Sequence, residues 1–589
     1  AGLYNYTPYQ PNAASLAAGA GAGDRCSAYG NRDFYANFVD WFGSPAYAVG
    51  GAIGRWYSSG GNSVRLGEPV ANEQAVSDGY WQAFLNGDIY LSPRSTWAVL
   101  GPIRSNYRTE GGPTGALGWP RAADYCTSAR QCHQWFDNGI IYTEWSTGTH
   151  SLIGDISTLH YSMGGTTGVL GLPVQGRQSS SGVWVQRFER GRIYSSSAGT
   201  AALSGYLNQW YDGPGRAEQL GQPVANESNT SYGVRQQFAN GSVHLTSTSA
   251  TMVLGPLART YSSLGGDTGM LGRPLSEAAC APTSCVQEFE HGRIYTAHGA
   301  GTWAVTAGVS QALDSSGGTA ILGFPTAAPT NSLGATVQTF QNGQVYVSAA
   351  GTAVLRGYLL RWHGGGANVR GLGAPVANET STGGGVQQKF ARGGAYLTPS
   401  GTAFSVLGPL DTTYSLAGGP LGLLGWPVSG EVCDASGCYQ QFESGRIYHG
   451  ASGGVVLRGA MLTTYLRQAL ATQLGSPISQ EQQTRSGVVQ RFGSGSLFLL
   501  PTSSFGTYGP IDTAYWRDGG FNSPLGEPRS AAVCPTSTWC FQTFGGGTLY
   551  TAHGAGTWSV LGPMDAWISA RGGITGSSPF WWGVWVSAR

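Results

Sequence analysis

Aromatic side chains at recurring positions are the best candidates for chemistry in this sequence of 589 residues. Three of them, Trp119, Phe324 and Trp426, fill the third position of a tetrapeptide Leu-Gly-x-Pro that recurs along the chain. The other copies hold Glu, Leu, Gln, Arg, Ala or Ser there, and because a core position would not accept that range, we expect the position to be exposed. Aromatic rings outside a core often contact sugars or partner proteins. We therefore predict that these three residues bind polysaccharide.

Five tryptophans occupy other positions that also repeat. Trp303 and Trp558 follow a Gly-Thr pair, whereas Trp56, Trp210 and Trp362 precede a glycine-rich link into the next repeat. We predict that these residues bind polysaccharide as well. The alternative for all eight aromatics is partial burial between neighbouring repeats.

Catalytic constellations are weak in this sequence. A Ser/His/Asp site of the hydrolase type would need Gly-x-Ser-x-Gly on a strand-to-helix turn, but Gly493-Ser494-Gly495 lies in a predicted hairpin turn. A glycosidase would need carboxylates that converge at about 5–9 Å. Glu73, Glu227 and Glu379 are copies of one position spread along the chain, and we expect each to accept backbone hydrogen bonds within its own repeat. We predict no enzyme, and a propeller-fold glycosidase is an alternative because other acids are free to converge.

Eight of the nine cysteines form close pairs at the same place in their repeats, which we predict to be between the proline and the following strand. The pairs are Cys126 with Cys132, Cys280 with Cys285, Cys433 with Cys438, and Cys534 with Cys540. A metal site would need two further ligands for each pair, and no Cys or His recurs at a fixed offset to supply them. We therefore predict four disulfides, no metal and no cofactor, in an oxidising compartment outside the cytoplasm. Cys26 is left over, and we expect its partner to lie upstream of Ala1.

The Leu-Gly-x-Pro tetrapeptide occurs ten times, and its prolines step by 50 to 53 residues. These prolines are Pro69, Pro120, Pro173, Pro223, Pro274, Pro325, Pro375, Pro427, Pro477 and Pro528. A period this regular indicates a tandem repeat of about 51 residues. Ser577-Ser578-Pro579 follows at the same spacing as a degenerate eleventh start.

Each repeat carries the same sequence of structural signals. A variable polar link follows the tetrapeptide, and Gln-x-Phe-x-x-Gly-x-Ile/Val-Tyr comes next, with apolar residues alternating around a glycine turn as in a β-hairpin. A third strand is predicted at Gly-Thr-x-x-Val-Leu, and Gly-Pro-Ile/Leu opens a short helix because proline is well tolerated at the first helical position. We predict three short strands and two helical turns per repeat, with the tyrosines of the hairpin and the helix in the core.

Composition excludes several partners. Charged residues make up 11% of the chain and the formal net charge is +1, whereas soluble domains average about 25% charged residues. Nucleic acids and anionic membranes bind basic surfaces, so we predict neither as a partner. No apolar run is long enough to span a membrane.

The ends of the chain differ from the repeats. Residues 1–50 form a non-repeat segment in which aromatics at helical spacing predict a short helix over Asn31–Phe42. At the other end, residues 580–589 are rich in tryptophan, and we expect them to close against earlier structure as a strand. Ala1 opens directly into polar sequence without a visible signal peptide, so we expect a mature form or a fragment.

From about residue 51 to 579 the sequence resembles tandem LGFP repeats, of which Leu322-Gly323-Phe324-Pro325 is a literal copy. The resemblance implies a secreted or wall-associated actinobacterial protein whose repeats anchor attached enzymes, such as mycoloyltransferases and peptidoglycan hydrolases, to wall polysaccharide. It also implies blade-like units in propellers of about five blades. Residues 1–45, with Tyr6–Ala13 and Cys26–Arg32, resemble the tail of a domain in secreted actinobacterial hydrolase-like proteins, which implies that a catalytic part precedes Ala1.

Together these observations predict a mainly β protein with short helices that is secreted and not catalytic. Its partner would be cell-wall polysaccharide, either arabinogalactan or a peptidoglycan-linked glycan, bound at many weak sites. The alternative from another class is a filament or adhesin subunit that self-associates through exposed aromatics. The predicted domains are the segment 1–50, two five-repeat propellers at 51–310 and 311–579, and the closing segment 580–589.

Overall fold

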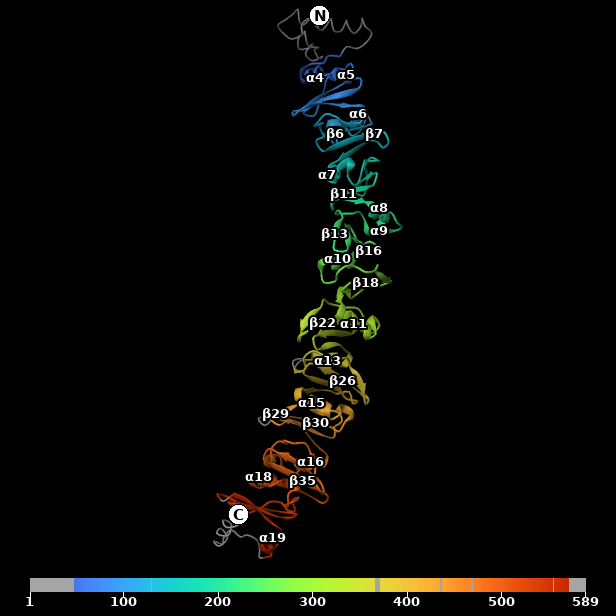
Figure 1. Cartoon of the computed structure of the whole chain (residues 1–589). Helices are drawn as coiled ribbons and strands as arrows, with labels where there is room; N and C mark the ends of the chain where they lie inside the picture. Colours follow the sequence, from blue (N-terminus) through green and yellow to red (C-terminus); the bar gives the residue numbers. More distant parts are fainter. Residues whose placement is uncertain are drawn as a thin grey trace, which may run out of the picture. The chain divides into compact units, whose positions relative to one another are not determined.

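The computed structural model describes residues 47–128, 130–365, 371–434, 437–467, 470–554 and 556–570. Ten four-stranded antiparallel sheets follow one another in chain order, each with its strands in sequence order and followed by a helix (Figure 1). The chain is thus mainly β with short helices, as predicted, and its blade-like sheets fit a propeller-like arrangement. The predicted helix over Asn31–Phe42, the closing segment 580–589 and Cys26 lie outside the described residues.

The chain divides into two compact units. Of the described residues, the first unit contains 47–279 together with 287–290, and the second contains 280–286 together with those from 291 to 570. The division into two five-repeat propellers at residue 310 stays a prediction. No helix in the described part of the chain is long and apolar enough to cross a membrane.

The strands of the first five repeats share one meander topology. They are β1 (Gln74–Val76), β2 (Gly79–Ala83), β3 (Gly87–Leu91), β4 (Thr96–Leu100); β5 (Tyr125–Ser128), β6 (Gln131–Phe136), β7 (Gly139–Glu144), β8 (Gly148–Ile153); β9 (Gln178–Ser180), β10 (Val183–Phe188), β11 (Gly191–Ser196), β12 (Gly199–Ser204); β13 (Ser228–Thr230), β14 (Gly233–Phe238), β15 (Gly241–Leu245), β16 (Ala250–Leu254); β17 (Ala279–Ala281), β18 (Ser284–Phe289), β19 (Gly292–Ala297) and β20 (Gly301–Thr306).

The last five repeats repeat this topology. Their strands are β21 (Thr330–Ser332), β22 (Ala335–Phe340), β23 (Gly343–Ser348), β24 (Gly351–Arg356); β25 (Thr380–Thr382), β26 (Gly385–Phe390), β27 (Gly393–Leu397), β28 (Ala403–Leu407); β29 (Val432–Asp434), β30 (Gly437–Phe442), β31 (Gly445–Gly450), β32 (Gly453–Arg458); β33 (Gln482–Gln483), β34 (Val488–Phe492), β35 (Gly495–Leu500), β36 (Ser503–Tyr508); β37 (Val533–Thr536), β38 (Trp539–Phe544), β39 (Gly547–Ala552) and β40 (Gly556–Leu561).

The described helices lie before the first sheet, between consecutive sheets or, for α19, after the last. They are α4 (Gly51–Tyr57), α5 (Asn62–Leu66), α6 (Gly101–Thr109), α7 (Asp155–Ser162), α8 (Gly205–Tyr211), α9 (Arg216–Leu220), α10 (Gly255–Ser263), α11 (Ala307–Ser315), α12 (Gly318–Leu322), α13 (Gly357–Gly364), α15 (Gly408–Leu416), α16 (Gly459–Arg467), α17 (Ala471–Leu474), α18 (Gly509–Arg517) and α19 (Gly562–Ser569). Short 3-10 turns follow five of them: η1 (Gly112–Thr114), η2 (Gly165–Thr167), η3 (Gly266–Thr268), η4 (Gly419–Leu421) and η5 (Gly520–Asn522).

The first strand of every sheet was not predicted from the sequence. It arises from the polar link after Leu-Gly-x-Pro, has two to four residues and pairs with the hairpin at the sheet edge, as β1 does with β2. Its side chains are mostly exposed, so the strand shows none of the apolar alternation that marks a half-buried strand. Each repeat therefore has four strands, and the prediction of three was wrong.

The Leu-Gly-x-Pro tetrapeptide is the joint between a helix and the next sheet. Its leucine is at most 2% exposed in all ten copies, and its proline forms an isolated bridge with the phenylalanine of Gln-x-Phe. The glycine between them has φ between 67° and 78°. In most copies a ring on the preceding helix bonds the carbonyl oxygen of that glycine, and Tyr107 Oη donates to Gly118 at 2.6 Å and Tyr261 Oη to Gly272 at 2.8 Å. Helix α11, before Gly323, has no such ring. The tetrapeptide thus builds the repeat, and the helix tyrosines are buried as predicted.

The glutamine of Gln-x-Phe joins neighbouring repeats. Gln134 Nε2 donates to Ala98 O of the preceding sheet at 2.8 Å and to Ala122 O of its own repeat at 2.9 Å. All ten glutamines are at most 1% exposed. The same pair of bonds forms at Gln82, Gln236, Gln287, Gln388, Gln440, Gln490 and Gln542. Since both acceptors are backbone carbonyls, the bonds do not depend on the neighbour's side chains.

Each helix fills the space between two sheets. Helix α6 packs on β3 and β4 of the first repeat and on β7 and β8 of the second. Tyr107 of this helix shares one core with Tyr90 and Val99 before it and with Leu117 and Phe136 after it. Burying such side chains contributes about 1.5–3 kcal/mol each. Most of the apolar core therefore lies between repeats, which is why one repeat alone cannot bury it.

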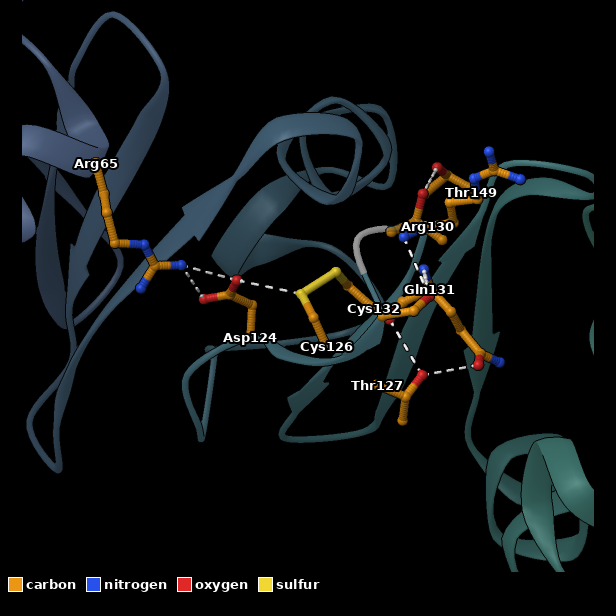
Figure 2. The surroundings of a disulfide bond; sticks show 10 residues. Arg65, Asp124, Cys126, Thr127, Arg130, Gln131, Cys132 and Thr149 are labelled. Atoms are coloured by element: carbon orange, nitrogen blue, oxygen red, sulfur yellow. Dashed lines mark hydrogen bonds and ion pairs between the residues drawn. A yellow bond between two sulfur atoms is a disulfide. The ribbon is translucent and has the colours of Figure 1, made fainter.

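The four predicted disulfides are present. They are Cys126–Cys132, Cys280–Cys285, Cys433–Cys438 and Cys534–Cys540, with Cα atoms 3.9 to 4.0 Å apart. Each joins the edge strand to the second strand of its sheet, as Cys126 of β5 does to Cys132 of β6 (Figure 2). Arg65 of the first repeat forms an ion pair with Asp124 beside Cys126, at 2.8 Å. The disulfides thus fasten edge strands whose first cysteine is exposed.

The second cysteine of each pair lies within a strand, not before it as predicted. Cys540 belongs to strand β38 itself and is half-buried, whereas Cys534 is exposed on the edge strand β37. Cys540 also packs against the core that contains Tyr515 and Phe544. The disulfide of Cys540 is confirmed, but its predicted place before the strand was wrong because the hairpin strand begins earlier than the Gln-x-Phe motif. The same correction holds for Cys132, Cys285 and Cys438.

Removing one disulfide is expected to cost at most about 2 kcal/mol, because a bridge that spans so few residues removes little entropy from the unfolded chain. The bridged cysteines Cys433 and Cys438 are separated by only 5 positions. The double change Cys433→Ser and Cys438→Ser tests this by urea unfolding, with the same change at Cys280 and Cys285 as the matched control. A loss above about 4 kcal/mol in either variant would show that the bridge also supports the packing between repeats.

Candidate functional site

The eight aromatics predicted to bind polysaccharide are mostly packed. Trp426 is 5% exposed, Trp210 is 9% exposed and Trp558 is 39% exposed, while Trp56, Trp119, Trp303, Phe324 and Trp362 are half-buried. At the third position of Leu-Gly-x-Pro, only Glu68 among the ten residues is exposed. The expectation that this position is exposed was therefore wrong, and the alternative of partial burial between repeats describes it better.

The tryptophans at this position fill a space that a glycine leaves in the preceding repeat. A Cβ atom added to Gly79 would lie 2.7 Å from the Trp119 ring, and one added to Gly385 would lie 2.5 Å from the Trp426 ring. Trp119 Nε1 also donates to Asp78 at 3.1 Å. The variety at the third position thus reflects a local partner in the neighbouring repeat, which a single sequence does not reveal.

Other aromatic side chains reach the surface. In the first unit the most exposed of them are Trp145, Tyr161, Tyr206 and Tyr125, with exposed fractions of 85, 65, 64 and 61%. In the second unit Tyr358 is 43% exposed. Tyr206 and Tyr358 share one position, the second residue of the helix, where other repeats carry proline, and the sequence analysis did not single it out. Trp145 had a local signal, because it lies in the turn between β7 and β8 and precedes the turn-forming run Ser146-Thr147-Gly148.

Ion pairs between the hairpin and the following helix recur inside the repeats. Asp88 has no exposed side-chain surface and pairs with Arg104 at 2.8 Å and with Arg108 at 2.6 Å. The signs are reversed in the fifth repeat, where Arg293 pairs with Asp314 at 2.7 Å. Removing its arginine partners would leave the buried Asp88 uncompensated, which costs about 3–5 kcal/mol. The Arg293–Asp314 pair is half-exposed and contributes less.

The motif Pro-Val-Ala-Asn-Glu joins repeats in a similar way. Asn226 Oδ1 accepts the backbone N–H of Ala202, and Asn378 Oδ1 accepts that of Val354, both at 2.8 Å. The glutamate that follows Asn378, Glu379, pairs with Arg356 of the preceding repeat at 2.9 Å. The expectation that this glutamate accepts backbone hydrogen bonds within its own repeat was therefore wrong for Glu379, and the asparagine makes the backbone contact.

A Ser–His–Asp line forms in the fourth repeat. Ser242 Oγ lies 2.9 Å from His244 Nε2, and His244 Nδ1 lies 2.8 Å from Asp267 Oδ1. These are the contacts of a hydrolase triad, but Ser242 is 3% exposed and faces the core. The Tyr232 hydroxyl also donates to Asp267, and Tyr261 Oη, whose single proton is shared with Gly272 O, lies 2.9 Å from Asp267 Oδ1. The buried serine gives a substrate carbonyl no access. The cluster, which also contains an ion pair between Arg235 and Asp267 at 3.6 Å, instead stabilises the contact between the hairpin and the segment that follows it.

Asp267 is expected to make the first unit sensitive to acid. Burial opposes its ionisation, but hydrogen bonds from His244 and Tyr232 outweigh burial and hold its pKa below the usual range. A lowered folded pKa gives stability that is complete above the unfolded pKa of about 3.9 and is lost as the pH falls below it. Urea midpoints of the wild-type chain and Asp267→Asn should therefore differ most at pH 7 and approach each other at pH 3. A parallel pH dependence would contradict this, and exposed Asp155→Asn is the control.

Two cavities lie between consecutive repeats of the second unit. The larger, of about 520 Å³, lies between β36 with the start of α18 and the Cys534–Cys540 disulfide of the tenth repeat. Its polar lining comes from Gln473, Ser504, Tyr508 and Thr551, and it also contacts Phe505. No acidic or basic side chain lines it. A concave space with aromatic rings and a few hydroxyl and amide groups is the usual form of a small-ligand site.

The smaller cavity, of about 330 Å³, lies between the eighth and ninth repeats and is charged. Its lining includes Asp434, Arg446 and His449 beside Tyr439 and Tyr448. The Arg446 guanidinium stacks on Tyr439 at 4.8 Å and donates to the Tyr448 hydroxyl at 3.3 Å. Most of the polar groups of this arginine are thus already used within the protein.

Five segments of the chain match one known family, at residues 66–115, 220–269, 271–320, 372–422 and 424–472. These segments are LGFP repeats. The other five repeats have the same four-stranded sheet and the same Leu-Gly-x-Pro joint. No curated protein matches the chain.

Among solved structures, the chain is similar at 10% identity to the extracellular domain of a hybrid two-component system protein from B. thetaiotaomicron, with a TM-score of 0.14. That match covers 83% of this chain and 59% of the other. PorZ, a surface component of the type-IX secretion system of Porphyromonas gingivalis, matches at 9% identity and a TM-score of 0.12, covering 81% and 62%. The chain thus spans less than two thirds of both proteins, and TM-scores this low carry no argument about fold or function.

The residues that recur in the LGFP repeats have structural roles. Leucine, glycine and proline form the joint, and glutamine and phenylalanine hold it against the hairpin and the preceding sheet. The surfaces that vary between LGFP repeats are the exposed aromatics and the two cavities. Binding chemistry is therefore to be sought at variable positions.

Proposed function

We propose that this chain is a non-catalytic module that binds cell-wall polysaccharide through several LGFP repeats at once. The exposed aromatic rings carry the proposal. Trp145, Tyr206 and Tyr358 belong to different parts of the repeat array and expose 85, 64 and 43% of their surface. Aromatic faces exposed in this way favour contact with the C–H faces of sugars, and separate rings can engage separate stretches of one polymer.

The charge balance supports a neutral polymer as the partner. The chain has 32 basic and 31 acidic residues, and the strongest pairs among them are satisfied inside the repeats. A surface with little net charge attracts neither nucleic acid nor anionic lipid. Neutral glycans, including arabinogalactan and other wall-linked chains, are bound by hydroxyl and aromatic groups and need no such charge.

The compartment fits the proposal. Four disulfides persist in an oxidising environment and are rare in reducing cytosol. The chain is thus an extracytoplasmic repeat module. Secretion to an actinobacterial wall, and the anchoring of an attached hydrolase there, are the finer parts of the proposal.

Cosedimentation of the whole chain with insoluble wall fractions tests this function. We expect binding to a polysaccharide fraction, and we expect the triple change Trp145→Ala, Tyr206→Ala and Tyr358→Ala to weaken it without lowering the melting temperature. Val64→Ala with Leu416→Ala is the matched control, because both side chains are apolar and 85% exposed but not aromatic. Trp426→Ala is a second control, since this ring is buried and its loss should lower stability.

The outcomes separate the candidate functions. Equal binding by the aromatic triple variant and the apolar control would exclude these rings as the contact residues. Absence of binding to every fraction would contradict the proposal. Concentration-dependent self-association, with no binding to glycan, would favour the filament or adhesin subunit.

A further inference from the structure

The larger cavity of the second unit has a cause in the sequence. In the fourth strand of the other nine repeats, the position equivalent to Gly506 is held by a residue with a side chain. These residues are Ala98, Ser151, Ala202, Met252, Ala304, Val354, Ser405, Val456 and Ser559. Hydrogen bonds from the next repeat confirm this register, because Gln542 donates to Gly506 O as Gln490 does to Val456 O. Gly506 lines the cavity, and the Tyr508 ring occupies the place that a side chain at Gly506 would take.

Tyr508 is the second unusual residue at this place. Leucine holds its position in four other repeats, at Leu100, Leu254, Leu407 and Leu561. The Tyr508 ring turns back over Gly506, so that a Cβ atom added there would lie 2.1 Å from the tyrosine hydroxyl. Glycine and tyrosine thus stand at two positions that hold other side chains in most repeats, and the exchange places a phenol at the cavity wall.

The polar groups around the cavity are available to a ligand. Among the described residues, the side chains of Gln473, Ser504 and Tyr508 form no hydrogen bond, although all three line the cavity. Thr551 Oγ1 accepts from Thr557 at 2.8 Å and retains acceptor capacity. Burial raises the pKa of the Tyr508 phenol, which therefore stays a hydrogen-bond donor at neutral pH. The unused groups comprise hydroxyl donors and acceptors and one amide.

We propose that this cavity, between the ninth and tenth repeats, binds a neutral sugar unit of the polysaccharide. The inference rests on the proposed function and names one of its sites. Phe505 and Tyr508 supply aromatic surface, and Gln473, Ser504 and Tyr508 supply hydrogen bonds to sugar hydroxyls. A sugar acid is disfavoured because no basic side chain lines the cavity to pair with its carboxylate. A volume of about 520 Å³ falls within the range of small-ligand sites.

Saturation-transfer NMR with the whole chain tests the site. The probes are D-galactose, D-glucose, D-arabinose and N-acetylglucosamine, with D-glucuronate as the charged comparison. We expect at least one neutral sugar to bind and glucuronate not to bind. Gly506→Val introduces the residue that Val354 and Val456 supply in other repeats. Because an added Cβ would lie 2.1 Å from the Tyr508 hydroxyl, this variant displaces the phenol from the cavity wall and should abolish the signal. Tyr508→Phe removes one hydrogen bond and should weaken the affinity by about 2- to 10-fold.

Controls keep the result interpretable. Ser262→Ala removes an exposed hydroxyl on helix α10 of the first unit and should leave the affinity unchanged. Circular dichroism checks that each variant is folded, and Tyr508→Leu, which restores the residue of four other repeats, serves if Gly506→Val does not fold. Unchanged affinity in a folded Gly506→Val or Tyr508→Leu variant would overturn the proposal.

The experiments distinguish a wrong assignment of the cavity from a wrong assignment of polysaccharide binding to the chain. If the chain cosediments with wall polysaccharide but none of the neutral sugars binds, the cavity is not the site and the proposed function stands. Binding of glucuronate alone would overturn the neutral-sugar assignment. If neither the polymer nor any sugar binds, both proposals fail.

Discussion

Gly323→Ala is expected to destabilise the second unit by about 4 kcal/mol, because two costs add at this glycine. Gly323 has φ 74° and ψ −166°, a region that is essentially closed to other residues and costs about 1–3 kcal/mol of strain. A Cβ atom would also lie 2.7 Å from Gln341 Cβ. The Gln341 side chain would have to move, although its Oε1 accepts the backbone N–H of Phe324 at 3.0 Å.

Gly475 separates the two costs, because it has nearly the same backbone conformation, with φ 72° and ψ −167°. The nearest atom to an added Cβ is 3.7 Å away, so only the strain remains and Gly475→Ala should cost about 2 kcal/mol. Gly430 has open space around it and no positive φ. Gly430→Ala should be neutral or slightly stabilising. Urea unfolding of the three variants checks the order, and equal stability of the Gly475 and Gly430 variants would refute the account of the joint.

Gln388→Glu is expected to separate the sixth and seventh repeats at neutral pH. Gln388 is 1% exposed, and its Nε2 donates to Val354 O at 2.8 Å and to Ala377 O at 3.0 Å. A glutamate would direct a charged oxygen at these two carbonyls, and an uncompensated buried charge costs about 3–5 kcal/mol. Gln388→Leu leaves the carbonyls without a donor and should cost about 2 kcal/mol. Urea midpoints and amide hydrogen exchange in the seventh repeat measure both losses.

The pH dependence distinguishes a buried charge from a packing defect. The pKa of the new carboxyl would be raised by burial, so its penalty grows as the pH rises through that value and falls away in acid. The Glu variant should therefore approach the Leu variant in stability at low pH. Gln483→Glu is the control, because Gln483 lies exposed on the edge strand β33. A pH-independent deficit in the Gln388→Glu variant would contradict the proposed bonding.

The Leu-Gly-x-Pro joint was predictable from the sequence because its residues are required by the backbone conformation. Leu-Gly-x-Pro recurs at a fixed period since the glycine conformation and the proline bridge are needed at every turn from helix to sheet. The hairpin, the helix and the four disulfides followed from spacing for the same reason. The edge strand was missed because an exposed strand held by backbone bonds alone needs no apolar pattern, as in β9 (Gln178–Ser180). The depth of Cys540 was missed with it, since the start of β38 has no signal of its own.

The candidate site was less predictable because it depends on pairs of residues in different repeats. Trp119 and Trp426 seemed exposed by their variable position, but each packs on a glycine about 40 residues earlier. The cavity at Gly506 and Tyr508 likewise results from two departures from the repeat. A search for recurring residues finds what the repeats share, whereas binding chemistry lies where they differ.

The most direct test of the central claim is inhibition of wall binding by soluble fragments of increasing chain length. The whole chain is bound to the insoluble polysaccharide, and competitors from single sugars to long chains are compared at equal total sugar concentration. Several weak sites on one chain predict that long competitors act at least about 100-fold more strongly per sugar than short ones. Equal potency per sugar at every length would show a single independent site and would contradict a multivalent module.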